Sequence, residues 1–289
     1  MPRVYATAKA FRTGLEDRLN KAAEVEQIQV NRLRRQVAFD RLLARLFRTD
    51  PPPWVLKGGY ALELRFKTAR ATLDIDLTVQ RVAATSENDA NQIVRDMLQN
   101  AASFRLGDWF EYTIGPPVMD LEAAPYGGAR YSVAAWMDGR IFARFHLDAG
   151  IGDAVIQPVE IIKCRDWLGF AGIASPLVQT ISREQQFAEK LHAYTRPRGS
   201  ANTRVKDLID LALLIRSGGL VLKRAADALH LTFHRRQTHE LPTELLKPPR
   251  EWQRRFQALA EECQLPAEMD AAFAEVEAFF GSMARFPTG

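Results

Sequence analysis

Residues 73–79, with the sequence LDIDLTV, restrict the fold of this chain more than any other segment. Polar and apolar side chains alternate there, and a period of two residues is typical of a β-strand with one buried face. The alternation predicts a core-facing set made up of Leu73, Ile75, Leu77 and Val79. It predicts an opposite, outward set made up of Asp74, Asp76 and Thr78.

Asp74 and Asp76 are the sharpest chemical feature of this strand. Neighbours on one strand face lie about 6–7 Å apart, and two carboxylates at that distance repel each other unless a cation lies between them. Mg²⁺ prefers one or two carboxylates together with substrate phosphates and water. The pair is therefore a candidate metal site. The alternative is two solvated charges on an exposed sheet face.

A glycine turn lies about 15 residues upstream. The apolar stretch 54–56 precedes Lys57, Gly58 and Gly59, and the helix-forming sequence ALELRF follows. A strand, a Gly-Gly turn and a helix N-terminus together expose backbone N–H groups to an anion, and glycine lets a phosphate approach the backbone closely. The turn is a candidate nucleotide-binding site. Alone it would also fit an ordinary turn, but its position shortly before the two acids favours phosphate binding.

A third acid is expected on the strand 141–148. Its alternation places Arg144, His146 and Asp148 on one face, and Asp138-Gly139 before it suits a hairpin turn. A neighbouring strand would bring Asp148 close to the first two acids, where it could deprotonate an attacking hydroxyl. The alternative is an aspartate that ends the strand and caps a turn at Gly150.

The remaining pattern predicts an α+β chain with a helical C-terminal part. Further strands are expected at 54–56, 131–137 and 155–162. Helices are expected at 10–48, 86–103, 183–195, from 203 to about 217, at 221–235 and at 250–283. The predicted domains are basic N-terminal helices over 1–50, an α+β core over 51–175 and a helical domain over 176–289.

Two of these C-terminal helices carry charged residues that merit attention. Ser182 and Gln185 fit a capping box at the start of the first helix. Lys190, at the edge of its packed side, is a candidate phosphate ligand or an ordinary surface lysine. Asp207 and Asp210 share one side of the next helix, where they could orient a lysine or form part of a simply capped helix.

The formal net charge of +4 is concentrated at the N-terminus. Residues 1–50 carry a net charge of +5 and the rest of the chain a net charge of −1. A basic segment of this kind is consistent with a nucleic-acid partner. The predicted RNA contacts are Arg32, Arg34, Arg35, Arg41 and Arg45.

Two cysteines 99 positions apart form no disulfide framework or CxxC motif, which favours a reducing cytoplasm. No apolar run reaches the roughly 18–20 residues that a membrane span needs. The sequence therefore predicts a cytoplasmic protein without a membrane partner.

Two blocks of sequence carry a family resemblance. KGGYALELRF…ATLDIDL, at about 54–80, and EQQFAEKLHAYTRPRG…RVKDLIDL, at about 182–215, resemble the AbiEii/AbiGii group of nucleotidyltransferase toxins, including MenT-like members. The resemblance implies a DNA polymerase β-like nucleotidyltransferase core. By position it implies a glycine turn at Gly58 and Gly59, metal ligands at Asp74 and Asp76, a motif lysine at Lys190, a later motif aspartate at Asp207 or Asp210, and a third acid at Asp148.

Two positions depart from the pattern of the family. Gly59 and Thr72 stand where relatives often have serine, and neither change removes catalytic chemistry. Thr72, beside the metal acids, is predicted to belong to the nucleotide site. It is also a hypothetical site of inactivating phosphorylation, because a phosphate there would place about −2 charge against Asp74 and Asp76.

The resemblance implies transfer of a nucleoside monophosphate from an NTP, with Mg²⁺ or Mn²⁺, to an RNA acceptor. In MenT-like members that acceptor is the tRNA 3′ end, whose extension would block translation. It also implies a cognate antitoxin encoded nearby, in a type IV system that needs no stable complex. Two alternatives remain open: a transferase that modifies a protein or small molecule, and a non-catalytic nucleic-acid-binding protein with the same fold.

Overall fold

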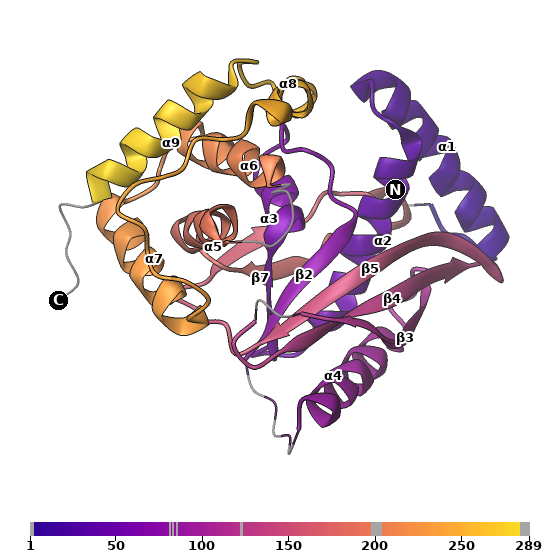
Figure 1. The fold of residues 1–289 in the computed structure, drawn as a ribbon. Coiled ribbons are helices and arrows are strands. Elements are labelled where there is room, and N and C mark those ends of the chain that lie inside the picture. The colour runs from indigo at the N-terminus through magenta and orange to yellow at the C-terminus, as the bar shows by residue number, and fades with distance from the viewer. Residues whose placement is uncertain are drawn as a thin grey trace. The chain divides into compact units, whose positions relative to one another are not determined.

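The computed structural model describes residues 3–80, 82, 84, 86–121, 124–197 and 204–283. The chain forms two compact units (Figure 1). The first unit comprises Met1–Tyr60, Ala71–Gly152 and Ile161–Thr180, and the second comprises Ala61–Arg70, Asp153–Glu160 and Ile181–Gly289. The division into 1–50, 51–175 and 176–289 stays a prediction. Residues 198–203, in the polar loop expected after the Lys190 helix, lie outside the described residues.

The first unit contains a seven-stranded sheet with the strand order β3-β4-β5-β2-β1-β7-β6. Its strands are β1 (Trp54–Lys57), β2 (Asp74–Val79), β3 (Glu111–Asp120), β4 (Gly128–Met137), β5 (Arg140–Ile151), β6 (Glu160–Lys163) and β7 (Leu177–Thr180). Strand β2 pairs antiparallel with β1 and parallel with β5. The hairpin between β4 and β5 turns at Asp138 and Gly139, both with positive φ, as the sequence predicts.

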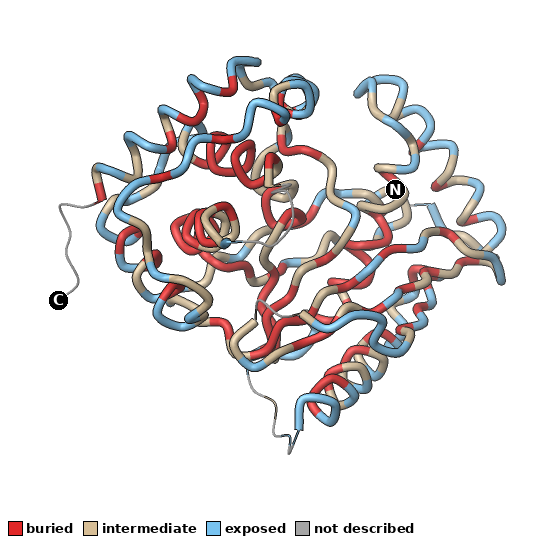
Figure 2. The backbone as a smooth tube through the Cα atoms, viewed as in Figure 1, coloured by how far each residue is buried: buried red, intermediate tan, exposed pale blue. Residues whose placement is uncertain are grey.

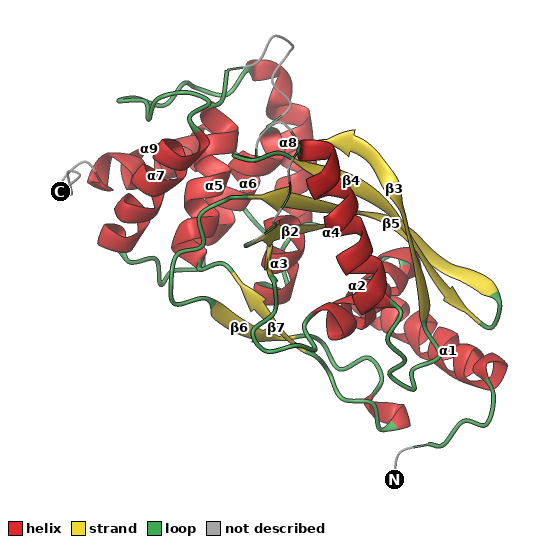
Figure 3. Ribbon diagram, turned by 90° about the horizontal axis from the view of Figure 1, so that it is seen from below, coloured by secondary structure: helices red, strands yellow, loops and turns green. Residues whose placement is uncertain are grey.

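Helices cover one face of this sheet. They are α1 (Ala8–Glu26), α2 (Val30–Leu46) and α4 (Glu87–Ala102), and α2 and α4 pack directly on the strands (Figures 1 and 3). The Phe39 ring of α2 meets the Phe145 ring of β5 at 4.7 Å between centroids. The Tyr131 hydroxyl of β4 donates a hydrogen bond to the Asn91 carbonyl of α4 at 2.8 Å. The face of β4 and β5 that points away from α2 and α4 carries exposed side chains.

Two expectations for the β2 segment are corrected. Leu73 is 57% exposed because it precedes the strand, which begins at Asp74. Thr78 is fully buried although it points to the same side as the acids. It lies in the middle of the sheet, opposite Val55 of β1 and Gly150 of β5.

The helices differ from the prediction mainly at their breaks. The expected helix 10–48 is two helices, because Gln27 adopts a left-handed conformation with φ of 55° and ends α1. The expected helix 250–283 is similarly divided into η2 (Arg250–Trp252), α8 (Gln253–Glu262) and α9 (Met269–Met283). Strands β3 and β7 were not predicted, and β3 contains Pro116 and Pro117 with two register shifts against β4.

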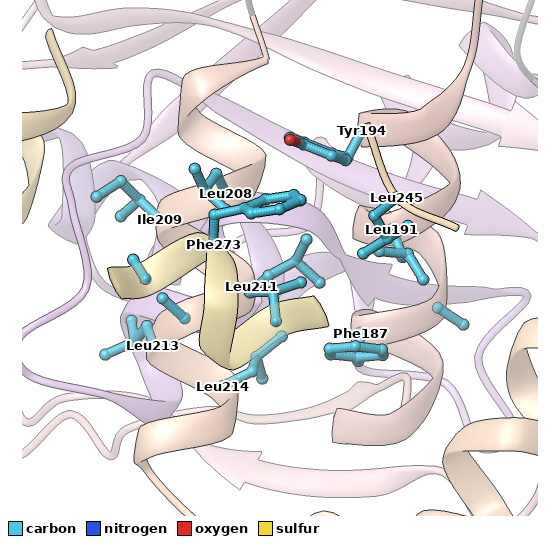
Figure 4. Close-up of a cluster of buried hydrophobic side chains, with 14 of the residues drawn as sticks. Phe187, Leu191, Tyr194, Leu208, Ile209, Leu211, Leu213, Leu214, Leu245 and Phe273 are labelled. Carbon is cyan, nitrogen blue, oxygen red and sulfur yellow. The ribbon is translucent and has the colours of Figure 1, made fainter. Parts of the chain in front are cut away.

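The second unit is helical around its own apolar core. Its helices include α5 (Arg183–Thr195), α6 (Val205–Arg216), α7 (Leu222–Arg236), α8 and α9, and α3 (Gly58–Arg65) continues into it from the first unit. Side chains such as Phe187, Leu211 and Phe273 meet between α5, α6 and α9 (Figure 4). Buried residues concentrate in α5, α6 and the strands of the sheet (Figure 2).

The start of α5 follows the predicted cap. The Ser182 hydroxyl accepts a hydrogen bond from the Gln185 N–H at 3.2 Å. Such a cap satisfies one of the backbone donors that every helix leaves unpaired in its first turn. Among the described residues, no helix is both long and apolar enough to cross a membrane.

Candidate active site

The three predicted acids of the first unit lie on two adjacent strands. The parallel register of β2 and β5 places Asp74 opposite His146 and Asp76 opposite Asp148. All of these side chains point to the face away from α2 and α4, because residues at i and i+2 of a strand share a face. The placement of Asp148 beside the first two acids therefore agrees with the prediction. Its catalytic role stays a prediction.

Arg130 of β4 joins this acidic group, and the sequence reasoning missed it. Its Nε and Nη2 donate to the two carboxylate oxygens of Asp148 at 2.7 and 2.8 Å. Its Nη2 also lies 3.4 Å from Asp74 Oδ2. The hydrogen bonds and charge of Asp148, with added effects from Asp74 and Asp76, raise the pKa of Arg130. The guanidinium is therefore a permanent positive charge among the three acids.

The glycine turn lies against the second acid. Strand β1 ends at Lys57, opposite Asp76, and α3 begins at Gly58, which has a φ of +67°. A Cβ on Gly58 would lie 1.9 Å from Asp76 Oδ2. The Gly59 N–H donates to the same oxygen at 3.4 Å. The turn thus needs glycine both for its backbone conformation and for the close approach of the carboxylate.

Thr72 lies over the second glycine of the turn. A Cβ on Gly59 would lie 2.6 Å from Thr72 Oγ1, so serine at position 59 would collide with this side chain as placed. The departure of Gly59 from the family pattern is therefore matched by the bulk of Thr72. The backbone carbonyl of Thr72 accepts a hydrogen bond from Arg35 Nε at 2.9 Å, which ties this segment to α2.

Gly58→Ala tests how closely the turn and Asp76 are coupled. We expect about a 10²-fold loss of the activity that the sequence predicts, because a displacement near 1 Å in a catalytic site has an effect of that size. Gly107→Ala is the matched control, since Gly107 has a φ of +68° and nothing within 4 Å of its Cβ position. Transfer rates and urea unfolding of both variants check this. Equal losses in the two variants would contradict the coupling.

A buried hydrogen bond anchors the start of α3 to α2. The Tyr60 hydroxyl donates to Asp40 Oδ1 at 2.5 Å, and Trp167 Nε1 donates to Asp40 Oδ2 at 2.9 Å. Burial raises the pKa of Asp40 to about 7, although Tyr60, Cys164 and Trp167 each oppose the rise through hydrogen bonds. Asp40 holds the residue that follows the glycine turn. The helical pattern of 10–48 contained no sign that an aspartate in it would be buried.

The acid group has the chemistry of a site for a hard divalent cation. No three His, Cys, Asp or Glu side chains within the described parts of the chain converge on a metal position. Mg²⁺, however, needs only one or two carboxylates when phosphates and water complete its shell. Asp74 fits this role because its contacts to Arg130 and His146, at 3.4 and 3.5 Å, are longer than strong charge-assisted hydrogen bonds. Asp74 and Asp76 are the residues that would hold the ion.

The predicted lysine and aspartates come together in the second unit. Lys190 Nζ of α5 lies 2.7 Å from Asp210 Oδ2 and 3.2 Å from Asp207 Oδ1 of α6. Arg70 adds a two-point ion pair to Asp210, at 2.9 and 2.7 Å. Arg204 lies 3.3 Å from Asp207. Neither contact was predicted; for Arg70, nothing local marks a partner 140 residues away in sequence.

Both aspartates are buried, and their partners distinguish them. The Asp210 side chain is 1% exposed and pairs with Arg70 and Lys190. The Asp207 side chain is 5% exposed and pairs with Lys190 and Arg204. Burial would raise the pKa of Asp210, but the charges of Lys190 and Arg70 outweigh it and lower the pKa. Burial likewise would lower the pKa of Lys190, but Asp210 and Asp207 raise it. Lys190 is therefore a charged ammonium, and Asp210 is placed to hold it rather than to meet a substrate.

The arginines predicted to contact RNA are largely engaged within the first unit. Arg41 and Arg45 have side chains 5% and 0% exposed, and both pair with the buried Asp108 at 2.7 and 2.6 Å. Their prediction as RNA contacts is corrected, because a phosphate cannot reach them. Arg34 pairs with Glu16 at 2.6 Å, and Arg35 binds the Thr72 carbonyl as described above. Arg32 is half-buried.

Comparison with known proteins identifies a family and similar folds. The model of the family described as "Nucleotidyl transferase AbiEii toxin, Type IV TA system" matches residues 41–279. MenT4, a nucleotidyltransferase toxin from Mycobacterium tuberculosis H37Rv, has a similar fold, with a TM-score of 0.61 and 18% identity over 90% of this chain and 86% of that chain. JHP933 from Helicobacter pylori gives a TM-score of 0.47 and 14% identity over 88% and 92%. No curated protein matches the chain. The predicted fold class is confirmed.

Proposed function

This chain belongs to the AbiEii family of nucleotidyltransferase toxins, and from that premise we propose that it transfers a nucleoside monophosphate from an NTP to the 3′ end of tRNA. The extended tRNA would no longer accept an amino acid, which blocks translation. The observation that supports the transfer chemistry most directly is the meeting of Asp74, Asp76 and the Gly58 turn where β1 ends beside the start of β2. The proposed partner is a cognate antitoxin, and the protein acts in the cytoplasm.

The predicted metal and nucleotide ligands of the first unit each have a role in this proposal. Asp74 and Asp76 hold Mg²⁺ or Mn²⁺, which when bound offsets negative charge on the triphosphate and the attacking oxygen. The backbone of Gly58 and Gly59 offers N–H groups to a phosphate, and their lack of side chains leaves room for it. Thr72 and Lys57 flank the turn and shape the nucleotide site.

The second unit contains the predicted motif lysine. Lys190 keeps its proposed role as a phosphate ligand that acts as a point charge. Asp210, fixed by Arg70, holds the lysine extended, and Asp207 shares its ammonium group. Because Asp210 makes the shorter contact to Lys190, at 2.7 Å against 3.2 Å for Asp207, we assign the positioning of Lys190 to Asp210.

Asp148 has a second role beside the catalytic one that the sequence suggested. Both of its oxygens accept hydrogen bonds from Arg130, so the two side chains hold each other in place. We therefore propose that Asp148 also fixes Arg130 next to Asp74. Arg130 would then balance the charge of the acids before the cation and the NTP bind.

A labelling experiment tests the proposed function. The purified protein is incubated with each of the four α-labelled NTPs, Mg²⁺ and bulk tRNA, and parallel reactions contain total protein extract or small-molecule acceptors. We expect label on tRNA and none on tRNA whose 3′ hydroxyl has been destroyed by periodate. Removal of divalent cations by a chelator should abolish labelling. Label that appears only on protein or small molecules, or on oxidised tRNA as well, would overturn the proposed acceptor.

A further inference from the structure

The outward face of the β4–β5 hairpin leads away from the acids as a continuous stripe. Successive cross-strand pairs along it are Arg130–Asp148, Ser132–His146, Ala134–Arg144 and Trp136–Ile141. Ser132, Arg144 and His146 are exposed, and Trp136 is half-buried. At about 3.4 Å per strand residue, the four steps along the strand from Asp148 to Arg144 span roughly 14 Å. The stripe is thus long enough to follow an extended polymer beyond the acids.

The arginine and aromatic side chains of the stripe are of the kinds that bind a single-stranded nucleic acid. Arg144 forms no ion pair within the described residues, so its charge is available to a partner. His146 is 48% exposed, and Arg130 is 29% exposed. Trp136 lies at the far end and offers an aromatic surface. Proteins that bind single strands combine cations that follow the backbone with aromatic side chains on which bases stack. Two acidic residues lie near this end: Glu111, opposite Trp136 on β3, and Asp138 in the hairpin turn, which pairs with Arg140.

We propose that the single-stranded 3′ end of the RNA acceptor lies along this face, with Arg144 on a backbone phosphate, Trp136 under a base and the terminal hydroxyl toward Asp76 and Asp148. The inference rests on the proposed function, because it presumes an RNA acceptor. It also relocates the RNA contacts. The arginines of α2 are mostly engaged in internal contacts, whereas the exposed Arg144 and His146 share a face with the acids.

Direct binding measurements test the path independently of catalysis. Labelled bulk tRNA is titrated with protein over a range of salt concentrations. Arg144→Ala is expected to weaken binding about tenfold at low salt and to reduce the salt slope by about one, as loss of one phosphate contact does. Trp136→Ala is expected to weaken binding about 5- to 100-fold, the range for loss of one base stack. Mg²⁺-NTP binding should stay unchanged in both variants.

Arg105→Ala is the matched control, since Arg105 is an exposed arginine of the same unit, outside the stripe. Arg144→Glu, a surface change, provides a second variant in case Trp136→Ala unfolds, and thermal melting reports folding of each protein. The path is overturned if wild type binds no tRNA, or if the Arg144 variants bind it as well as Arg105→Ala does. If the protein labels tRNA but the Arg144 variants bind tRNA as tightly as wild type, the proposed RNA path is rejected and the proposed function is not. Binding that depends on Arg144 without any labelling would reject the proposed function alone.

Discussion

Asp76→Asn is expected to reduce nucleotidyl transfer about 10³-fold, equivalent to roughly 4 kcal/mol of lost transition-state stabilisation. The amide keeps the size of the carboxylate and one oxygen for the Gly59 N–H, so the turn should remain in place. What disappears is the negative charge that would hold the divalent cation. Transfer to tRNA at saturating NTP measures the effect, and a Mg²⁺ titration should show a higher midpoint.

Asp96→Asn is the control for Asp76→Asn. Asp96 lies on α4 in an exposed pair with Arg95, and its side chain is 53% exposed. Removal of that charge should leave transfer within about twofold of wild type, because exposed ion pairs contribute little. If Asp76→Asn retains more than a tenth of the wild-type rate, the assignment of Asp76 as a metal ligand is wrong.

Asp210→Ala is expected to lower the free energy of unfolding by about 3–5 kcal/mol. The substitution leaves the buried Arg70 without its carboxylate partner and leaves Lys190 with Asp207 alone. The large cost comes from the buried charge that loses its partner rather than from the net strength of the ion pairs. Equilibrium unfolding in urea, followed by circular dichroism, measures it.

Two comparisons make the test of Asp210 specific. Asp227→Ala removes the exposed partner of Lys223 on α7 and should cost less than about 1 kcal/mol. Arg70→Met combined with Asp210→Ala should cost less than the sum of the single changes, because residues in one network are not additive. If Asp210→Ala is no more destabilising than Asp227→Ala, Asp210 is not the centre of this network.

The features that were predictable from the sequence are those with short-range causes. The LDIDLTV strand, the glycine turn, the Asp138-Gly139 hairpin turn and the Ser182 cap each depend on residues within a few positions of one another. The breaks at Gln27 and Gln264 were missed, because a non-glycine residue in the left-handed region carries little local signal. Strand β3 was missed because it contains two prolines, which cannot donate backbone hydrogen bonds to a neighbouring strand and so argue against a strand.

Arg130 shows why the composition of the site needed the tertiary structure. If the residues of β4 and β5 paired one by one from the two-residue turn, Arg130 would lie opposite Leu147, whose side chain is buried. A β-bulge between Ala135 and Trp136 shifts the register by one residue and pairs Arg130 with Asp148 instead. Such a shift turns a side chain to the other face of the sheet. The residues around the bulge contain no sequence pattern that predicts it.

The sequence by itself determined which residues are the candidates for the chemistry: the acids of β2, the glycine turn and the lysine and aspartates of α5 and α6. Local alternation and helical spacing are enough to orient such residues on their own elements. Only the tertiary structure decided their partners, because ion pairs such as Arg70–Asp210 and Arg45–Asp108 join residues distant in sequence. It also decided that a basic helix near the N-terminus buries two of its arginines, since a buried carboxylate stabilises charge that would otherwise need water.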